Sequence, residues 1–264
     1  MQIAVDRIAL AAARRLGDRS AQARTLYGLA TSLRRSGRFH DADLHYRQAL
    51  DLYSTLGDLT SQADAHFGLA VIAEQQGRFA DVLARAQQAL DLLSRTDDRA
   101  GQARMLNNVG WAYALLGDYR RAVDLCTQAL SRQQELGIHP AEATTWDSLG
   151  RAYRGLADYE RAVACHRRAI NLFRDVGDRY SEAEGLNNLG DTHDAAGSPH
   201  AAGAAWRRAL DTLDQLHTPT PTGSAGRSEP PSRADTPGDD VYRGFIAQPV
   251  SRHPTISAPG SRSA

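Results

Sequence analysis

A repeat of 40 residues is the feature that most restricts how this chain can fold. When the sequence is shifted by 40 residues, the following pairs coincide without a gap: Ala49-Leu50, Ala89-Leu90, Ala129-Leu130, Ala169-Ile170 and Ala209-Leu210. Five full units run from about residue 16 to residue 215. A fixed period of this length is typical of repeat architectures, in which each unit packs against its neighbours.

Each unit has the pattern of two helices. In the third unit, Asp98 is placed to cap a first helix, and Met105, Val109 and Tyr113 follow with the spacing of one buried helical face. Gly117-Asp118 then predicts the end of that helix and the cap of a second one. One hairpin cannot cover both of its faces. The sequence therefore predicts an all-α, right-handed superhelical solenoid of antiparallel helix pairs.

Glycines in the middle of the first helices indicate close contacts between helices. Gly110, Gly150 and Gly190 each cost about 1 kcal/mol of helix propensity relative to alanine. We expect each glycine to let the second helix of its unit approach closely. The expected partners form a column of small residues: Ala42, Ala122, Ala162 and Ala202.

The fourth unit resembles the tetratricopeptide repeat, because it carries the pattern Trp146, Leu149, Gly150, Tyr153, Ala162 and Ala169. This resemblance covers residues 1–217. It implies a solenoid whose first helices line a concave surface that binds proteins or extended peptides. The 40-residue period is longer than the common period of the family, which indicates longer helices.

A narrower resemblance rests on the segments Leu106–Gly110 and Leu186–Gly190, which read Leu-Asn-Asn followed by Val or Leu and by Gly. With the long period, these segments are similar to the C-terminal arrays of bacterial signalling ATPases of the NB-ARC/STAND type and of antibiotic-pathway transcriptional regulators. They are also similar to kinesin light chains and to receptor proteins that bind signalling peptides. The resemblance implies the sensor or interaction arm of a bacterial signalling or transcriptional regulator.

The repeat register divides the chain into three parts. Residues 1–16 match the second helix of an incomplete leading repeat, and residues 17–217 hold five hairpins. Residues 218–264 contain eight of the ten prolines among Ser, Thr and Gly, which predicts a disordered tail. Its one apolar segment, 241–250, is either a docking motif, a flap over the array or featureless. The leading helix is either an N-terminal cap or part of a longer protein, and the uncapped ends could contact a parent domain or a second copy.

Composition excludes several classes of partner. The chain has 31 basic and 31 acidic residues, so it lacks the positive charge expected for direct binding to nucleic acid or to an anionic membrane surface. No apolar run is long enough for a signal peptide or a membrane span. Cys126 and Cys165 give no disulfide framework and no Cys-x-x-Cys motif, so we expect a cytoplasmic protein.

The sequence predicts no catalytic site, no cofactor and no metal. It has no phosphate-binding loop, no dinucleotide-binding fingerprint, no zinc-protease motif and no calcium loop. His66, His166 and His193 occupy packing positions, and both cysteines match small apolar core residues. We therefore expect a binding protein rather than an enzyme.

The candidate peptide-binding surface is the concave face implied by the resemblance. Its predicted residues are Arg24, Tyr27, Arg34, Phe67, Asn107, Asn108, Trp111, Asp147, Arg151, Arg154, Asn187, Asn188 and Asp191. Asparagine amides in this place can clamp the backbone of an extended peptide, since each both donates and accepts; the alternative is a polar face without a ligand. The aromatic residues either contact a ligand or pack between neighbouring first helices.

Charge along this surface alternates from unit to unit. Arg24 and Arg34 are followed by Asp64 and Glu74, then by basic and again by acidic residues in the last two units. This alternation predicts a ligand of mixed charge. Two other functions remain open: a purely intramolecular packing array of a truncated multidomain ATPase or regulator, and a non-catalytic accessory subunit of an enzyme.

Overall fold

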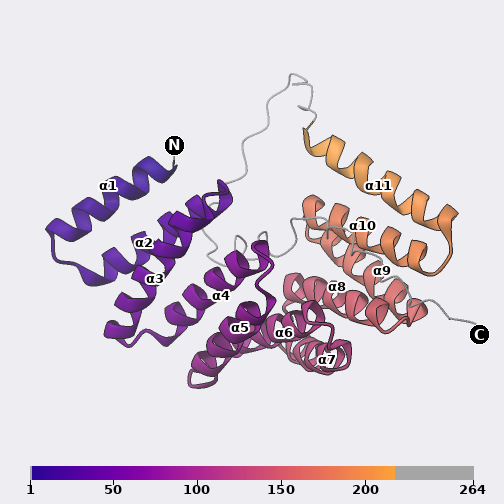
Figure 1. The fold of residues 1–264 in the computed structure, drawn as a ribbon, viewed down its shortest axis with the longest axis horizontal. Coiled ribbons are helices and arrows are strands. Elements are labelled where there is room, and N and C mark those ends of the chain that lie inside the picture. Colours follow the sequence, from indigo (N-terminus) through magenta and orange to yellow (C-terminus); the bar gives the residue numbers. More distant parts are fainter. Residues whose placement is uncertain (1, 218–264) are drawn as a thin grey trace, which may run out of the picture.

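The computed structural model describes residues 2–217, which form eleven α-helices and no strand (Figure 1). The helices are α1 (Gln2–Arg15), α2 (Arg19–Arg35), α3 (Phe39–Leu56), α4 (Leu59–Gln75), α5 (Phe79–Ser94), α6 (Arg99–Leu115), α7 (Tyr119–Leu136), α8 (His139–Gly155), α9 (Tyr159–Asp175), α10 (Arg179–Ala195) and α11 (Pro199–His217). The predicted disordered tail, with its apolar segment 241–250, lies outside the described residues.

Each helix packs against the next one, and the array bends into an arch (Figure 1). In addition, α2 contacts α4, α6 contacts α8, and α8 contacts α10, whereas no two odd-numbered helices within residues 2–217 contact each other. The even-numbered helices, which are the first helices of their units, therefore follow the inner side of the arch. The predicted all-α solenoid of antiparallel helix pairs is confirmed.

Caps and tight turns set the helix boundaries. The side chain of Asp98 accepts a hydrogen bond from the backbone N–H of Gly101, which confirms the predicted N-cap. Asp18, Asp58, Asp118, Asp158 and Asp178 cap their helices in the same way. Glycine occupies the left-handed position of most turns, but Ala157 takes it with φ 59°. A Cβ atom in that conformation costs about 1–2 kcal/mol.

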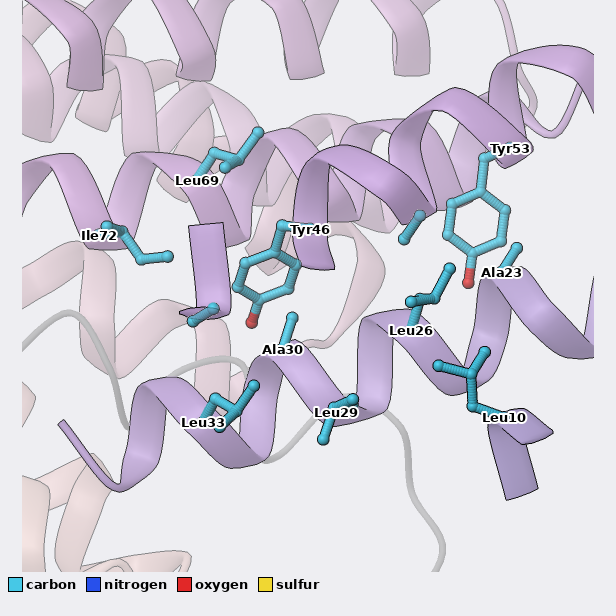
Figure 2. Packing of buried hydrophobic residues seen from close by; sticks show 12 residues of the cluster. Leu10, Ala23, Leu26, Leu29, Ala30, Leu33, Tyr46, Tyr53, Leu69 and Ile72 are labelled. Atoms are coloured by element: carbon cyan, nitrogen blue, oxygen red, sulfur yellow. The ribbon is translucent and has the colours of Figure 1, made fainter. Parts of the chain in front are cut away.

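The core of the first units joins four helices. Figure 2 shows Leu10 of α1, Leu26 of α2 and Tyr46 of α3 in one buried cluster with Leu69 and Ile72 of α4. Because second helices pack between successive first helices, each unit shares its core with the next one. This sharing makes the stability of each unit depend on its neighbours.

The glycines do permit close approach, and the side chain that each meets most closely lies four residues after the expected alanine. A Cβ atom on Gly150 would lie 2.5 Å from His166 Cε1. One on Gly110 would lie 2.6 Å from Cys126 Sγ and 3.2 Å from the backbone oxygen of the predicted Ala122, and Gly190 faces Trp206. The partner lies 16 residues after the glycine in each unit, where side chains differ greatly in size. Glycine is therefore the complement of a larger residue on the second helix.

Candidate functional site

Ion pairs connect neighbouring first helices along the inner face. The Arg104 guanidinium on α6 lies 2.8 Å from the Asp64 carboxylate on α4. Farther along, Arg154 on α8 lies 3.3 Å from Asp191 on α10. The alternation of charge between units therefore serves, at these two places, to pair adjacent units with each other.

Asp147 of α8 is the centre of a buried polar cluster. Its carboxylate lies 2.9 Å from Nδ1 of His166 on α9, and it accepts hydrogen bonds of 3.0 Å from the Asn188 amide on α10. His166 is fully buried and Asn188 nearly so. Burial acts to raise the pKa of Asp147, but the hydrogen bond and charge of His166, the charge of Arg151 and the amide of Asn188 hold that pKa below its usual value. The cluster thus favours the carboxylate form and joins three helices.

Arg151 extends this cluster toward the third unit. Its guanidinium donates to Asn188 Oδ1 at 2.9 Å and lies over the Trp111 ring, 4.8 Å from the ring centroid. The Trp111 indole in turn donates to the Glu74 carboxyl group at 3.1 Å. A continuous path of polar contacts therefore runs from α4 through α6 and α8 to α10. We call Glu74, Trp111, Asp147, Arg151, His166 and Asn188 the inner network.

Burial favours the neutral form of two carboxyl groups on this face, those of Glu74 and Glu184. Burial raises the pKa of Glu74 to about 8, and burial together with the charge of Asp147 raises the pKa of Glu184 to about 9. One carboxyl oxygen of each residue is buried and has no hydrogen-bond partner. Such groups are costly to ionise in place.

These two residues predict a pH dependence of stability. The folded chain binds both protons more tightly than the unfolded chain, so the free energy of unfolding falls as pH rises from about 4.5, the usual value, toward about 9. We expect Glu184→Gln to raise the free energy of unfolding by about 1–3 kcal/mol at pH 9 and to change it little at pH 4. Urea denaturation at both pH values measures this difference. An equal effect at the two pH values would show that ionisation of Glu184 is not its cause.

The predicted site residues fall into three groups by exposure. Arg24 and Asn187 are exposed. Half-buried positions hold Tyr27, Arg34, Arg151, Arg154 and Asp191. The buried group consists of Phe67, Asn107, Asn108, Trp111, Asp147 and Asn188.

The four asparagines of the predicted backbone clamp are separated by this grouping. Only Asn187 presents its amide to solvent. Asn188 is bonded to Asp147 and Arg151, and Asn108 donates to the Met105 sulfur at 3.5 Å. Asn107 is buried with an unpartnered Oδ1. Three of the four amides therefore face protein atoms in this structure.

The aromatic residues pack between helices. Phe67 belongs to a buried cluster with Leu93 and Met105, while the Tyr27 ring meets the Tyr46 ring edge-on at 5.4 Å. Trp111 lies beneath Arg151, as described above. These contacts hold the three aromatic side chains between helices, and their contact with a ligand stays a prediction.

Two residues that take part in the polar contacts of this face were absent from the predicted set. His166 on α9 bonds to Asp147, and Trp206 on α11 donates to Asp191. One spacing in the sequence could have identified both residues, because each is a large side chain 16 positions after a mid-helix glycine.

Reactive thiols and metal-ligand clusters are not found in the part of the chain that the structure describes. Both cysteines are buried free thiols, and burial raises the pKa of Cys126 to about 12 and that of Cys165 to about 11. Between residues 2 and 217, no three His, Cys, Asp or Glu side chains come together as metal ligands would. None of the described helices combines the length and apolar character needed to cross a membrane.

Family models agree with the architecture. One tetratricopeptide repeat model matches residues 61–135, 115–175 and 141–215, and a second one matches residues 27–84. A comparison with curated proteins finds no significant match.

Three solved structures with the same fold come from different kinds of protein. BtubC from P. vanneervenii has a TM-score of 0.66 and 25% sequence identity, over 88% of this chain and 98% of that one. A Rap protein complexed with Competence and Sporulation Factor has a TM-score of 0.67 and 16% identity, over 75% of this chain and 55% of its own. The STAND protein PH0952 from Pyrococcus horikoshii, which has a tetratricopeptide repeat sensor, has a TM-score of 0.60 and 17% identity, over 74% of this chain and 31% of its own. With family models matching most of its length, the chain belongs to the tetratricopeptide repeat family.

Proposed function

We propose that this chain is a non-catalytic scaffold that holds a protein or an extended peptide on the inner face of its arch. Repeats of this family typically form scaffolds for protein–protein interaction. The observation that carries the proposal is the inner network, which fixes α4, α6, α8 and α10 relative to one another. A surface held rigid before binding loses less entropy when a partner docks.

The polar groups that remain available lie on either side of this network. Arg34 on α2 and Asn187 on α10 make no side-chain hydrogen bond or ion pair within the described residues. Arg34 can bind a carboxylate, and the Asn187 amide can both donate to and accept from a peptide backbone. The two groups lie on first helices at opposite ends of the array, which suits a ligand that extends along it.

The wider role that we propose is the sensor or interaction arm of a bacterial signalling or transcriptional regulator. Two of the similar structures support this proposal: one is a Rap protein with a bound factor, and the other is a STAND protein whose repeats are called a sensor. At 16% and 17% identity, these two structures show a shared fold alone. The proposed role therefore rests on analogy with them and on the available side chains of Arg34 and Asn187.

The test is a comparison of inner and outer variants. A partner captured from the source cell is titrated by calorimetry against wild type, Arg34→Ala/Asn187→Ala and the outer-face control Arg120→Ala. We expect the double variant to bind about tenfold more weakly or worse, since each lost hydrogen bond costs about 0.5–1.5 kcal/mol. The control should match wild type. If Arg120→Ala weakens binding and the double variant does not, the partner binds the outer face.

A further inference from the structure

A groove separates the second helices α9 and α11, which lie at one end of the arch and do not contact each other within residues 2–217 (Figure 1). Leu189 and His193 of α10 close its bottom, and Ala204 lines it on α11. Its volume is about 440 Å³. A second hollow of about 390 Å³ continues along α9 to Glu160, and Arg167 lines both. We call the two hollows together the outer groove.

The repeat shows why the outer groove is open. In the third and fourth units an arginine guanidinium lies over a tyrosine ring, 5.4 and 4.9 Å from the ring centroid: Arg121 over Tyr113, and Arg161 over Tyr153. The equivalent residues of the fifth unit, 40 positions after Tyr153 and Arg161, are His193 and Ala201. Both have smaller side chains, and both line the groove. The stack that covers this position in two other units is therefore replaced by open space.

Charge is distributed unevenly along the outer groove. Arg167, Arg174 and Arg208 line the larger hollow, and none of the described residues that line it is acidic. Arg174 is paired with Glu182 at 2.7 Å, whereas the side chains of Arg167 and Arg208 make no hydrogen bond or ion pair within residues 2–217. At the other end, the exposed Glu160 also has no such partner there. An occupant that fits has carboxylates at one end, a cation farther along and apolar side chains between them.

One segment of the same chain has this pattern. Residues 239–246 read Asp-Asp-Val-Tyr-Arg-Gly-Phe-Ile, and they lie outside the described residues. Arg243 follows Asp240 by three residues, which span about 10 Å in an extended chain. Arg167 and Glu160 are also separated by about 10 Å along α9. The charges of the segment therefore match those of the groove in both order and spacing.

The connection to α11 allows this segment to reach the groove. Residues 218–238 link the end of α11 to Asp239 and can span up to about 70 Å, whereas Arg208 lies about 14 Å from the end of α11. The chain leaves α11 at the arginine end of the groove, so the acidic residues arrive there first. A segment linked in this way has an effective concentration on the order of 1 mM, which favours it over the same sequence on another molecule.

We propose that residues 239–246 dock in the outer groove, with Asp240 at Arg167 and Arg243 at Glu160. The aromatic side chains of the segment fill the space that the arginine–tyrosine stacks cover in the third and fourth units. The groove is then occupied by the chain itself and not by a partner protein. The inner face takes no part in this contact, so the inference and the proposed function can fail separately.

Disulfide trapping in the full chain tests the contact. Gly244→Cys is combined with Ala204→Cys, at an exposed position in the groove, or with Leu210→Cys, at a 61% exposed position of α11 outside it. A disulfide requires that the two Cα atoms come within about 7 Å. We therefore expect the chain with Ala204→Cys to form an intramolecular disulfide at least about tenfold faster than the chain with Leu210→Cys. Cys126 and Cys165 do not compete, because both are buried and their pKa values are raised.

Substitutions in the chain with Ala204→Cys test the two features of the groove. Arg167→Asp should slow trapping more than about threefold, whereas Arg168→Asp, the same change at an exposed neighbouring position outside the groove, should not. Adding Asp240→Arg to Arg167→Asp should restore the rate. His193→Tyr/Ala201→Arg, which rebuilds the stack of the other units, should also slow trapping.

Three results would overturn the inference. One is an equal trapping rate at positions 204 and 210, and another is an equal rate for Arg167→Asp and Arg168→Asp. The third is a disulfide that forms only between chains, seen as a covalent dimer, because the segment would then bind a second copy. If no disulfide forms at position 204, the inference also fails, and the groove is left to an acidic segment of another protein.

Discussion

Gly150→Leu should destabilise the array by more than about 3 kcal/mol, because the site has no room for a side chain. A Cβ atom alone would lie 2.5–2.7 Å from three ring atoms of His166. That ring is fully buried and bonded to Asp147, so it cannot move without breaking the cluster. Overpacking of a close contact costs about 1–3 kcal/mol, and the lost hydrogen bond to a charged group adds about 1.5–3 kcal/mol. Urea denaturation followed by circular dichroism measures the loss.

Gly28 provides a matched control in the first unit. It lies in the interior of α2, and a Cβ atom there would meet nothing within 4 Å apart from the adjoining backbone of α2 itself. Gly28→Ala should therefore raise the free energy of unfolding by about 0.5–1 kcal/mol through helix propensity. Gly150→Ala should lower it. If the two alanine variants shift stability in the same direction, the close contact with His166 is not what requires glycine at position 150.

Asp147→Ala should cost about 3–5 kcal/mol, the usual loss when one partner of a buried charged cluster is removed. The substitution leaves the His166 imidazole and the Asn188 amide without their shared acceptor, and it removes the carboxylate that lies 3.8 Å from the Arg151 guanidinium. Asp194→Ala, at an exposed position of α10, should change stability by less than about 0.5 kcal/mol. Chemical denaturation of both variants at pH 7 makes the comparison.

The contribution of Asp147 to the free energy of unfolding should also depend on pH over a defined range. Since the fold holds its pKa below the usual 3.8, the stabilisation is fully present above about pH 4 and is lost as pH falls through the folded-state value. Wild type and Asp147→Ala should therefore converge in stability at acid pH. A constant difference between them from pH 7 to pH 2 would show that the loss comes from packing rather than from the carboxylate.

The architecture followed from the sequence because its signals are local and repeated. The pattern around Asp98 and Gly117 predicted a cap and a helix end from residues a few positions apart, and the structure has both. Each unit restates the same information with the same spacing, so an error in one unit would not have changed the fold. The family resemblance of the fourth unit led to the same conclusion.

The candidate site could be predicted less well from the sequence, because its geometry depends on contacts between units. The position of Asn188 predicted a place on a first helix, but not that the amide would be bonded to Asp147 and Arg151 on the preceding first helix. The same limit affected Gly150, whose partner His166 depends on how two helices cross. Periodicity shows which residues share a face, and it does not show how much of that face the next unit covers.

The most direct test of the proposed function is photo-crosslinking from single positions on the two faces. A benzophenone amino acid is placed at Asn187 on the inner face or at Arg120 on the outer face, both of which are exposed. The captured partner is then added and irradiated, and its crosslinked peptides are mapped by mass spectrometry. Binding on the inner face predicts strong crosslinks from position 187 and few from position 120. Strong crosslinks from position 120 with none from position 187 would contradict it.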